Sequence, residues 1–310
     1  MSSLIRLAMV PLIILGASAA PLAAQSAAPA AAAPEVLFRL DDVGMNHSVN
    51  TAIARVAATG MPFSVSVMFA CPWYQEAVEI LKKNPHVAVG VHLALNSEWR
   101  GYRWGPVLGK AGVPSLVGAD GYLLPSTSAF LAHKYDLGEV ERELSAQMDR
   151  AMASGLKISY ADFHMGTAVA TPQLREVFER VAKKYGVGMS TYFGESYKTM
   201  WGVPVASKQS ELMSHLANLK TGQVNLIEVH VAERTPEMEA IFDQNAPEQN
   251  GANGAPGVVA HRSAELAMML SPELAQQVRS GRIRLVTYAQ LMARAGGPAG
   301  MHRPTSRAGE

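Results

Sequence analysis

The chain of 310 residues contains 48% hydrophobic and 17% charged residues, and its 27 basic side chains nearly balance 26 acidic ones. This composition is typical of a folded globular protein and excludes a disordered chain. Because the formal net charge is only +1, we expect no nucleic-acid partner.

The N-terminal segment differs from the rest of the chain. Arg6 precedes an apolar run at 7–15 and then small residues, which is typical of a secretory signal, and we assign residues 1–25 to it. Residues 26–34 form an uncharged Ala/Pro linker. The apolar run is too short to span a bilayer, so we expect no stable membrane anchor after cleavage and a periplasmic or secreted location.

Residues 35–295 have the length of one (β/α) barrel, and residues 296–310 read as a flexible Gly/Pro-rich tail. Short apolar runs predict seven strands, at 36–40, 63–69, 86–95, 157–163, 187–191, 224–231 and 283–286. Helical spacing predicts helices near 49–57, 73–83, 137–153, 172–185, 263–280 and 288–294. The alternation of strand and helix predicts a single α/β domain, a TIM-like (β/α) barrel that is seven-stranded or distorted.

Cys71 is the single cysteine, so no intramolecular disulfide can form. We expect this thiol to be a small buried hydrophobe rather than a reactive group. Met268 and Met269, which neighbour each other in a segment with helical spacing, are expected to fill the core.

Four of the predicted strands end in titratable side chains. These are Asp41 and Asp42, His92, Asp162 and His164, and Glu228 and His230. In a parallel barrel the carboxyl ends of the strands meet at one face, and two imidazoles with one carboxylate are a common ligand set for a catalytic divalent metal. Singly, Asp41 and Asp42 could cap the next helix, and a lone His92 or His230 is more often a buried, hydrogen-bonded histidine than a ligand. Jointly, these residues favour a metal site.

A second signal lies in the irregular stretch 96–128. Trp99, Tyr102, Arg103 and Trp104 fall within six residues, and flat rings beside polar donors suit stacking on sugars. The alternative is a loop that packs on its own barrel.

Several motifs now resemble one family. They are LDDVGMNHSVNTAI at 40–53, VGVHLALNSEW at 89–99, YADFHMGT at 160–167, IEVHVAE at 227–233 and HRSAEL at 261–266. In order, and across about residues 36–292, they resemble the YdjC/ChbG-like carbohydrate deacetylases, distant relatives of polysaccharide deacetylases. The resemblance implies a (β/α) barrel, one divalent metal ion (Zn²⁺ or Mg²⁺) and hydrolysis of an N-acetyl group on an amino sugar or oligosaccharide.

The resemblance also implies roles for individual residues. The metal ligands it implies are Asp42, His92 and His164. Asp41 would be the general base and His230 the general acid. Arg262 and Glu265, in HRSAEL, match a family segment that is expected to have a supporting role. We include Arg262 with Trp99, Tyr102, Arg103 and Trp104 among the substrate-binding residues.

The chain also departs from the family pattern. Met165-Gly166-Thr167 replaces a His-rich run after His164, and Val231-Ala232 replaces Pro-Gly after His230. Two other functions stay open at this point. One is a glycoside hydrolase with paired carboxylates drawn from Asp41, Asp42, Asp162 and Glu228, and the other is a sugar-binding barrel without turnover.

Overall fold

The computed structural model describes residues 32–245 and 257–304. The predicted signal at 1–25, most of the linker and the last six residues of the tail lie outside the described residues. All that follows concerns the unit that spans Ala33–Glu310.

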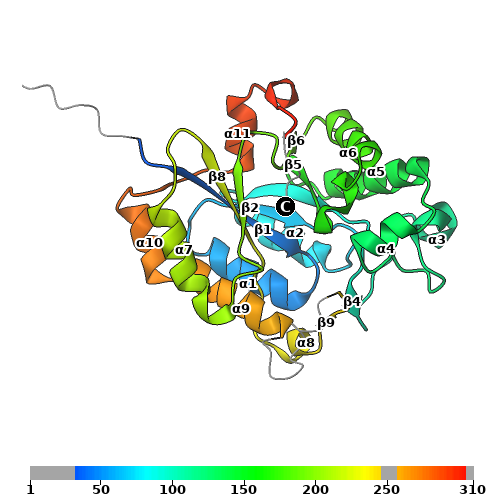
Figure 1. The fold of residues 1–310 in the computed structure, drawn as a ribbon, viewed down its shortest axis with the longest axis horizontal. Helices are drawn as coiled ribbons and strands as arrows, with labels where there is room; N and C mark the ends of the chain where they lie inside the picture. The colour runs from blue at the N-terminus through cyan, green and yellow to red at the C-terminus, as the bar shows by residue number, and fades with distance from the viewer. Residues whose placement is uncertain (1–31, 246–256, 305–310) are drawn as a thin grey trace, which may run out of the picture. The chain divides into compact units, whose positions relative to one another are not determined.

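One curled parallel sheet forms the centre of this unit (Figure 1). Its strands are β1 Glu35–Val43, β2 Ser64–Val67, β3 Ala88–Leu93, β5 Ile158–Phe163, β6 Gly188–Met189, β7 Ser196–Thr199, β8 Val224–Val229 and β10 Arg284–Leu285. Seven of them follow the order β6-β5-β3-β2-β1-β8-β7, and β10 pairs with the first residues of β1. Within the described residues β6 and β7 are the two ends of this path, so the sheet is a distorted barrel that does not close, which confirms the predicted fold class.

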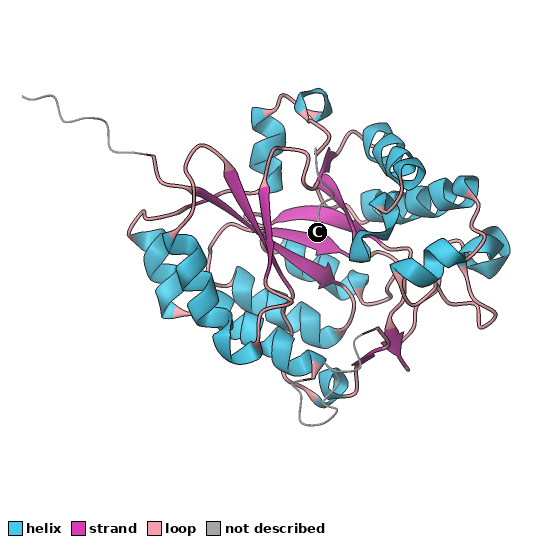
Figure 2. Ribbon diagram, viewed as in Figure 1, coloured by secondary structure: helices cyan, strands magenta, loops and turns pink. Residues whose placement is uncertain are grey.

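Helices cover the outside of the sheet (Figure 2). The longer ones are α1 His47–Ala57, α2 Tyr74–Lys82, α5 Leu137–Ala153, α6 Pro172–Lys184, α7 Lys208–Ala217, α9 Val258–Met269, α10 Pro272–Arg279 and α11 Tyr288–Arg294. Short helices α3 Gly109–Gly112, α4 Thr127–Ala132 and α8 Pro236–Glu239 lie in the connections. β4 Trp99–Arg100 and β9 Phe242–Asp243 pair as a separate two-stranded antiparallel sheet. None of the described helices is long and apolar enough to cross a membrane.

The structure corrects two parts of the element prediction. The helix expected at 263–280 is two helices, because Pro272 has no N–H to continue α9 and Ser271 accepts a hydrogen bond from the amide of Leu274 to start α10. Strand β7 and helix α7 were missed. The four residues of β7 are all half-buried and carry polar groups, so no apolar run marks them.

The core follows from the strand sequences. In β1 every residue after Glu35 is buried, as expected for a parallel strand covered on both faces. Cys71, Met268 and Met269 are buried, with at most 1% of their surface exposed, which confirms that they pack in the core. Several buried charged residues, among them Arg39, Asp41, Asp42, His92 and His164, line one cavity at the carboxyl ends of the strands.

Candidate metal centre and active-site cavity

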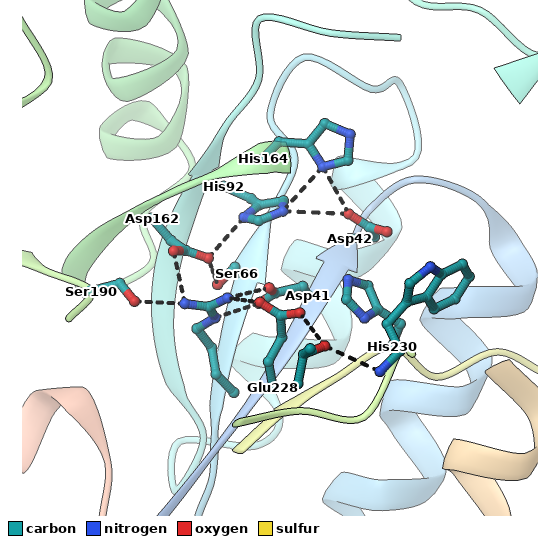
Figure 3. A network of polar contacts seen from close by, with 12 residues as sticks. Asp41, Asp42, Ser66, His92, Asp162, His164, Ser190, Glu228 and His230 are labelled. Carbon is teal, nitrogen blue, oxygen red and sulfur yellow. Dashed lines mark hydrogen bonds and ion pairs between the residues drawn. The ribbon is translucent and has the colours of Figure 1, made fainter. Parts of the chain in front are cut away.

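The predicted site residues converge at the carboxyl ends of β1, β3, β5 and β8 (Figure 3). Asp41, Asp42, His92, His164 and His230 all line one cavity of about 540 Å³. This volume lies within the range of roughly 300–1,000 Å³ that is typical of small-molecule sites. The arrangement of strands therefore brings together residues up to 189 positions apart.

A local bulge places both aspartates at this cavity. Side chains alternate along a strand, so Asp41 shares a face with Arg39 while Asp42 would point to the other side. The pairing of β1 with β2 shifts register between Leu40 and Val43, and Asp42 adopts a left-handed conformation with φ of 62°. This turn of the backbone re-aims Asp42, as bulges do at strand ends.

Left-handed backbone marks the same cavity at two further positions. Met165 and Thr191 have φ of 53° and 70°, and with Asp42 they are the three non-glycine residues of the described chain with positive φ. All three line the cavity. Such strained residues persist where the surrounding structure holds them, and they cluster at functional sites.

Three potential ligand atoms form a nearly equilateral triangle. Asp42 Oδ1 lies 3.4 Å from His92 Nε2 and 3.3 Å from His164 Nδ1, and the two nitrogens are 3.2 Å apart. A cation about 2.0–2.2 Å from each of three tetrahedral ligands requires them to be roughly 3.3–3.6 Å apart. The triangle thus has the size that a zinc-like ion requires, and all three side chains are buried.

Hydrogen bonds on the outer side of the imidazoles leave their inner nitrogens as lone pairs. His92 Nδ1 lies 2.9 Å from Asp162 Oδ2, and His164 Nε2 lies 2.9 Å from Glu98 Oε2. Because a carboxylate only accepts, each of these nitrogens donates, and in the neutral rings His92 Nε2 and His164 Nδ1 carry no proton. Among the described residues, Asp42 Oδ1 also has no hydrogen-bond donor. Three acceptors therefore face one point, an arrangement that a bound cation satisfies.

The pKa values of the two histidines also indicate that positive charge is favoured at the triad. Burial alone would lower the pKa of His92, but Asp41, Asp162 and Asp42 raise it to about 9. The pKa of His164 is likewise raised, against burial, by Glu98 and Asp42. Without a metal the site would hold protons in its place.

Two other groups of residues could in principle hold a metal, but Arg39 forms ion pairs with the carboxylates of both groups. These groups are Asp41 with His92 and Asp162, and Asp41 with Glu228 and His230. The Arg39 guanidinium binds Asp41 through two nitrogens at 2.8 and 2.7 Å, and it also reaches Asp162 at 3.0 Å and Glu228 at 2.5 Å. An internal cation already neutralises these carboxylates, which leaves the Asp42 triad as the candidate metal site.

The hydrogen bonds and ion pairs around the triad join more acids than bases. The acids are Asp41, Asp42, Glu98, Asp162 and Glu228, and the bases are Arg39 and Arg262. With His92 and His164 neutral, five carboxylates face two guanidinium groups, and this network carries an excess of negative charge. A divalent cation would neutralise most of it.

Asp41 and His230 lie beside the triad rather than in it. Burial raises the pKa of Asp41 above its ordinary value of 3.8, although Arg39 opposes this effect. Burial lowers the pKa of His230, whose ring stands edge-on to Trp201 with centroids 5.4 Å apart. A carboxylate that is more basic than usual and an imidazole that releases its proton readily are suited to proton transfer.

The predicted substrate-binding residues divide into two sets. Trp99 and Arg262 line the cavity. Tyr102, Arg103 and Trp104 are not among the lining residues. Tyr102 donates its hydroxyl to the carbonyl of Met45, Arg103 donates to the carbonyl of Leu123, and Trp104 packs against His164 with centroids 6.0 Å apart. These contacts position the loop, and a direct contact of the three residues with a substrate stays a prediction.

Several residues of the site were not singled out from the sequence. Arg39 has a visible signal, since it is a charged residue inside an apolar strand two positions before Asp41. Glu98 and Trp201 lie outside the predicted strands and helices, and no spacing connects them to the histidines. Only the folded chain places Glu98 behind His164 and Trp201 beside His230.

Comparisons with known proteins identify the family of the chain. The carbohydrate deacetylase of Vibrio campbellii is 26% identical over 272 residues, which cover 84% of this chain and 97% of that protein. The carbohydrate deacetylase of Listeria welshimeri is 31% identical over 158 residues, 50% of this chain and 60% of that protein. A solved structure from Enterococcus faecalis V583, described as a proposed cellobiose-phosphate cleavage protein, has the same fold. It superposes with a TM-score of 0.65 at 23% identity and covers 84% of this chain and 99% of that chain. Residues 35–280 match the family described as YdjC-like protein, and the chain therefore belongs to the YdjC-like family.

Proposed function

We propose that this protein is a metal-dependent hydrolase that removes N-acetyl groups from amino-sugar-containing glycans. The observation that carries the proposal is the buried triangle of Asp42, His92 and His164, whose potential ligand atoms are 3.2–3.4 Å apart. The substrate class follows from the family, because relatives of nearly full length are named carbohydrate deacetylases.

The donor set suits a divalent cation. Two imidazoles and one carboxylate favour zinc and, less readily, harder ions such as magnesium. Bound there, the ion would polarise the acetamide carbonyl and make a nearby water more acidic. The residues around it then supply the proton transfers.

Asp41 is placed to accept a proton from the attacking water. Arg39 holds both of its carboxylate oxygens, so the side chain keeps one orientation toward the cavity. His230 lies on the neighbouring strand end with a ring nitrogen within 4.8 Å of a carboxylate oxygen of Asp41. It can protonate the amine as the C–N bond breaks, so that the products are acetate and a free amino sugar.

The geometry argues against the glycoside hydrolase alternative. That mechanism needs one protonated and one free carboxylate on either side of a glycosidic bond. Here Asp41, Asp162 and Glu228 all bind the same guanidinium group of Arg39. None of the three is free to act as a separate acid.

An acetate-release assay on N-acetylated oligosaccharides, combined with elemental analysis of the purified protein, tests the proposal. We expect about one divalent metal ion per chain and acetate release without a change in chain length. Asp42→Ala, His92→Ala and His164→Ala should each lose metal and activity together. Full turnover after chelation would refute the mechanism, and tight glycan binding with no acetate release from metal-loaded protein would favour a sugar-binding barrel.

We also propose that the enzyme is exported and acts in the periplasm or outside the cell. The composition of residues 1–25 supports this, with one basic residue, an apolar run and small residues. Mass spectrometry of the protein from a periplasmic fraction should find an N-terminus near the start of the Ala/Pro linker. An uncleaved chain confined to the cytoplasm would contradict export.

A further inference from the structure

Helix α9 reaches the metal triad from the far end of the chain. Arg262 of α9 is 1% exposed, and its Nη2 donates to Asp42 Oδ2 at 2.5 Å. The other oxygen, Oδ1, faces His92 and His164 and receives no hydrogen bond from any residue of the described ranges. One oxygen of the carboxylate is thus held by an arginine while the second is left free for a ligand.

Two tryptophans contact the guanidinium group. The Arg262 carbon Cζ lies 5.3 Å from the centroid of the Trp99 ring and 5.5 Å from that of Trp201, within the range of cation–π interactions. Its Nε and Nη1 are buried and have no hydrogen-bond partner among the residues that the structure describes.

The same helix also holds the strand end that carries His230. Glu265 lies three positions after Arg262, on the same face of α9, and its Oε2 accepts the backbone N–H of His230 at 2.6 Å. Lys208 donates to Glu265 Oε1 at 2.5 Å, so the buried carboxylate is itself paired. Adjacent turns of α9 therefore contact the metal ligand Asp42 and the main chain of His230, the cavity residue that we assign as the acid.

We propose that α9 is the positioning element of the site. Arg262 orients Asp42 so that Oδ1 alone can bind the metal, and Glu265 fixes the main chain of His230 at a set distance from it. A carboxylate that binds through one oxygen leaves coordination positions open for water and substrate, which a catalytic metal needs. This inference rests on the proposed metal-dependent function and extends it to two residues that touch neither the metal nor the reacting atoms.

The test measures metal binding separately from activity. In Arg262→Met the metal dissociation constant, obtained by competition with a chromophoric chelator, should rise about 10- to 100-fold, the usual effect of losing an outer partner of a ligand. The absorption spectrum of the cobalt-loaded variant should also change, because Asp42 is no longer held at Oδ2. Arg262→Lys keeps the charge but not the planar fork, so it should fall between the variant and the wild type.

Glu265→Gln tests the contact of α9 with His230 separately from its contact with Asp42. Its metal dissociation constant should stay within about twofold of wild type, while kcat falls and KM changes little. Arg294→Met is the matched control, because it removes an arginine that binds Glu35 through an exposed pair outside the cavity, and it should leave metal binding and activity unchanged.

Wild-type metal affinity and an unchanged cobalt spectrum in Arg262→Met would overturn the inference while leaving the proposed function in place. A wild-type protein that binds no divalent metal would overturn both. Near-UV circular dichroism establishes that each variant is folded. If Arg262→Met does not fold, Arg262→Lys decides by the same two measurements.

Discussion

The buried ion network centred on Arg39 makes a quantitative prediction about stability. One guanidinium group, 3% exposed, binds three carboxylates on three different strands and also donates to Ser190. Arg39→Met preserves most of the volume of the side chain but removes the guanidinium group that contacts both Asp41 and Asp162. Several negative charges then remain buried and close together.

The expected loss is large. Removing one partner of a buried ion pair costs about 3–5 kcal/mol, because the remaining charge is left uncompensated. Asp162 illustrates the scale: although burial opposes it, Arg39 and His92 lower its pKa to about 2 from 3.8, and a shift of that size is worth about 2 kcal/mol. We therefore expect Arg39→Met to lose about 3–5 kcal/mol of unfolding free energy at pH 7.

The sign of the pH dependence follows from the same groups. A carboxylate with a depressed pKa stabilises the fold above its unfolded value and loses that effect as the pH falls, so the wild type keeps the Asp162 contribution down to about pH 2–4. In the variant, burial without Arg39 raises the carboxylate pKa values, and protonation relieves the repulsion as the pH falls below 7. The difference in stability between wild type and variant should therefore narrow toward low pH.

Urea unfolding followed by tryptophan fluorescence measures this difference at pH 7 and pH 5, with a chelator present so that metal binding does not contribute. Arg294→Met, which breaks an exposed pair with Glu35, should cost no more than about 1 kcal/mol at either pH. A loss below about 1 kcal/mol for Arg39→Met at pH 7, or a loss that is independent of pH, would refute the reasoning.

Three further predictions concern single residues. Glu98→Gln leaves His164 without its outer carboxylate, so zinc affinity should fall about 10- to 100-fold in a chelator competition, and wild-type affinity would count against the assigned site. Burial lowers the pKa of His230 below 6.5, so the kcat/KM of the wild type should decline as the pH rises through that lowered value. The variant His230→Gln should lack this decline. A pH profile identical to that of the wild type would exclude His230 as the acid. In Gly90→Ala the new Cβ would lie 2.4 Å from the buried Tyr160 ring, and the free energy of unfolding should fall by about 1–3 kcal/mol. The control Gly202→Ala places its Cβ more than 4 Å from the atoms of all described residues except its chain neighbours and should leave stability unchanged. Equal melting temperatures of the two variants would contradict this packing.

The alternation of elements could be predicted from the sequence because buried parallel strands are continuous apolar runs. The seven predicted strands match β1, β2, β3, β5, β6, β8 and β10. The order of strands in the sheet could not be predicted, and β7 was missed because its polar residues carry no apolar pattern. Strand ends nevertheless located the site, since parallel topology gathers them at one face.

The sequence by itself determined which residue types stand at the strand ends, and so the prediction of a metal site and of its chemistry. The family resemblance already pointed to Asp42, His92 and His164, but only the tertiary structure showed that Arg39 pairs with carboxylates of the other two possible ligand groups. It also decided that Arg262, 220 positions from Asp42, holds one oxygen of that carboxylate. The physical reason is that a ligand set depends on distances of a few ångströms and on which charge neighbours which. The spacing of residues along the chain predicts neither these distances nor which charges lie next to one another.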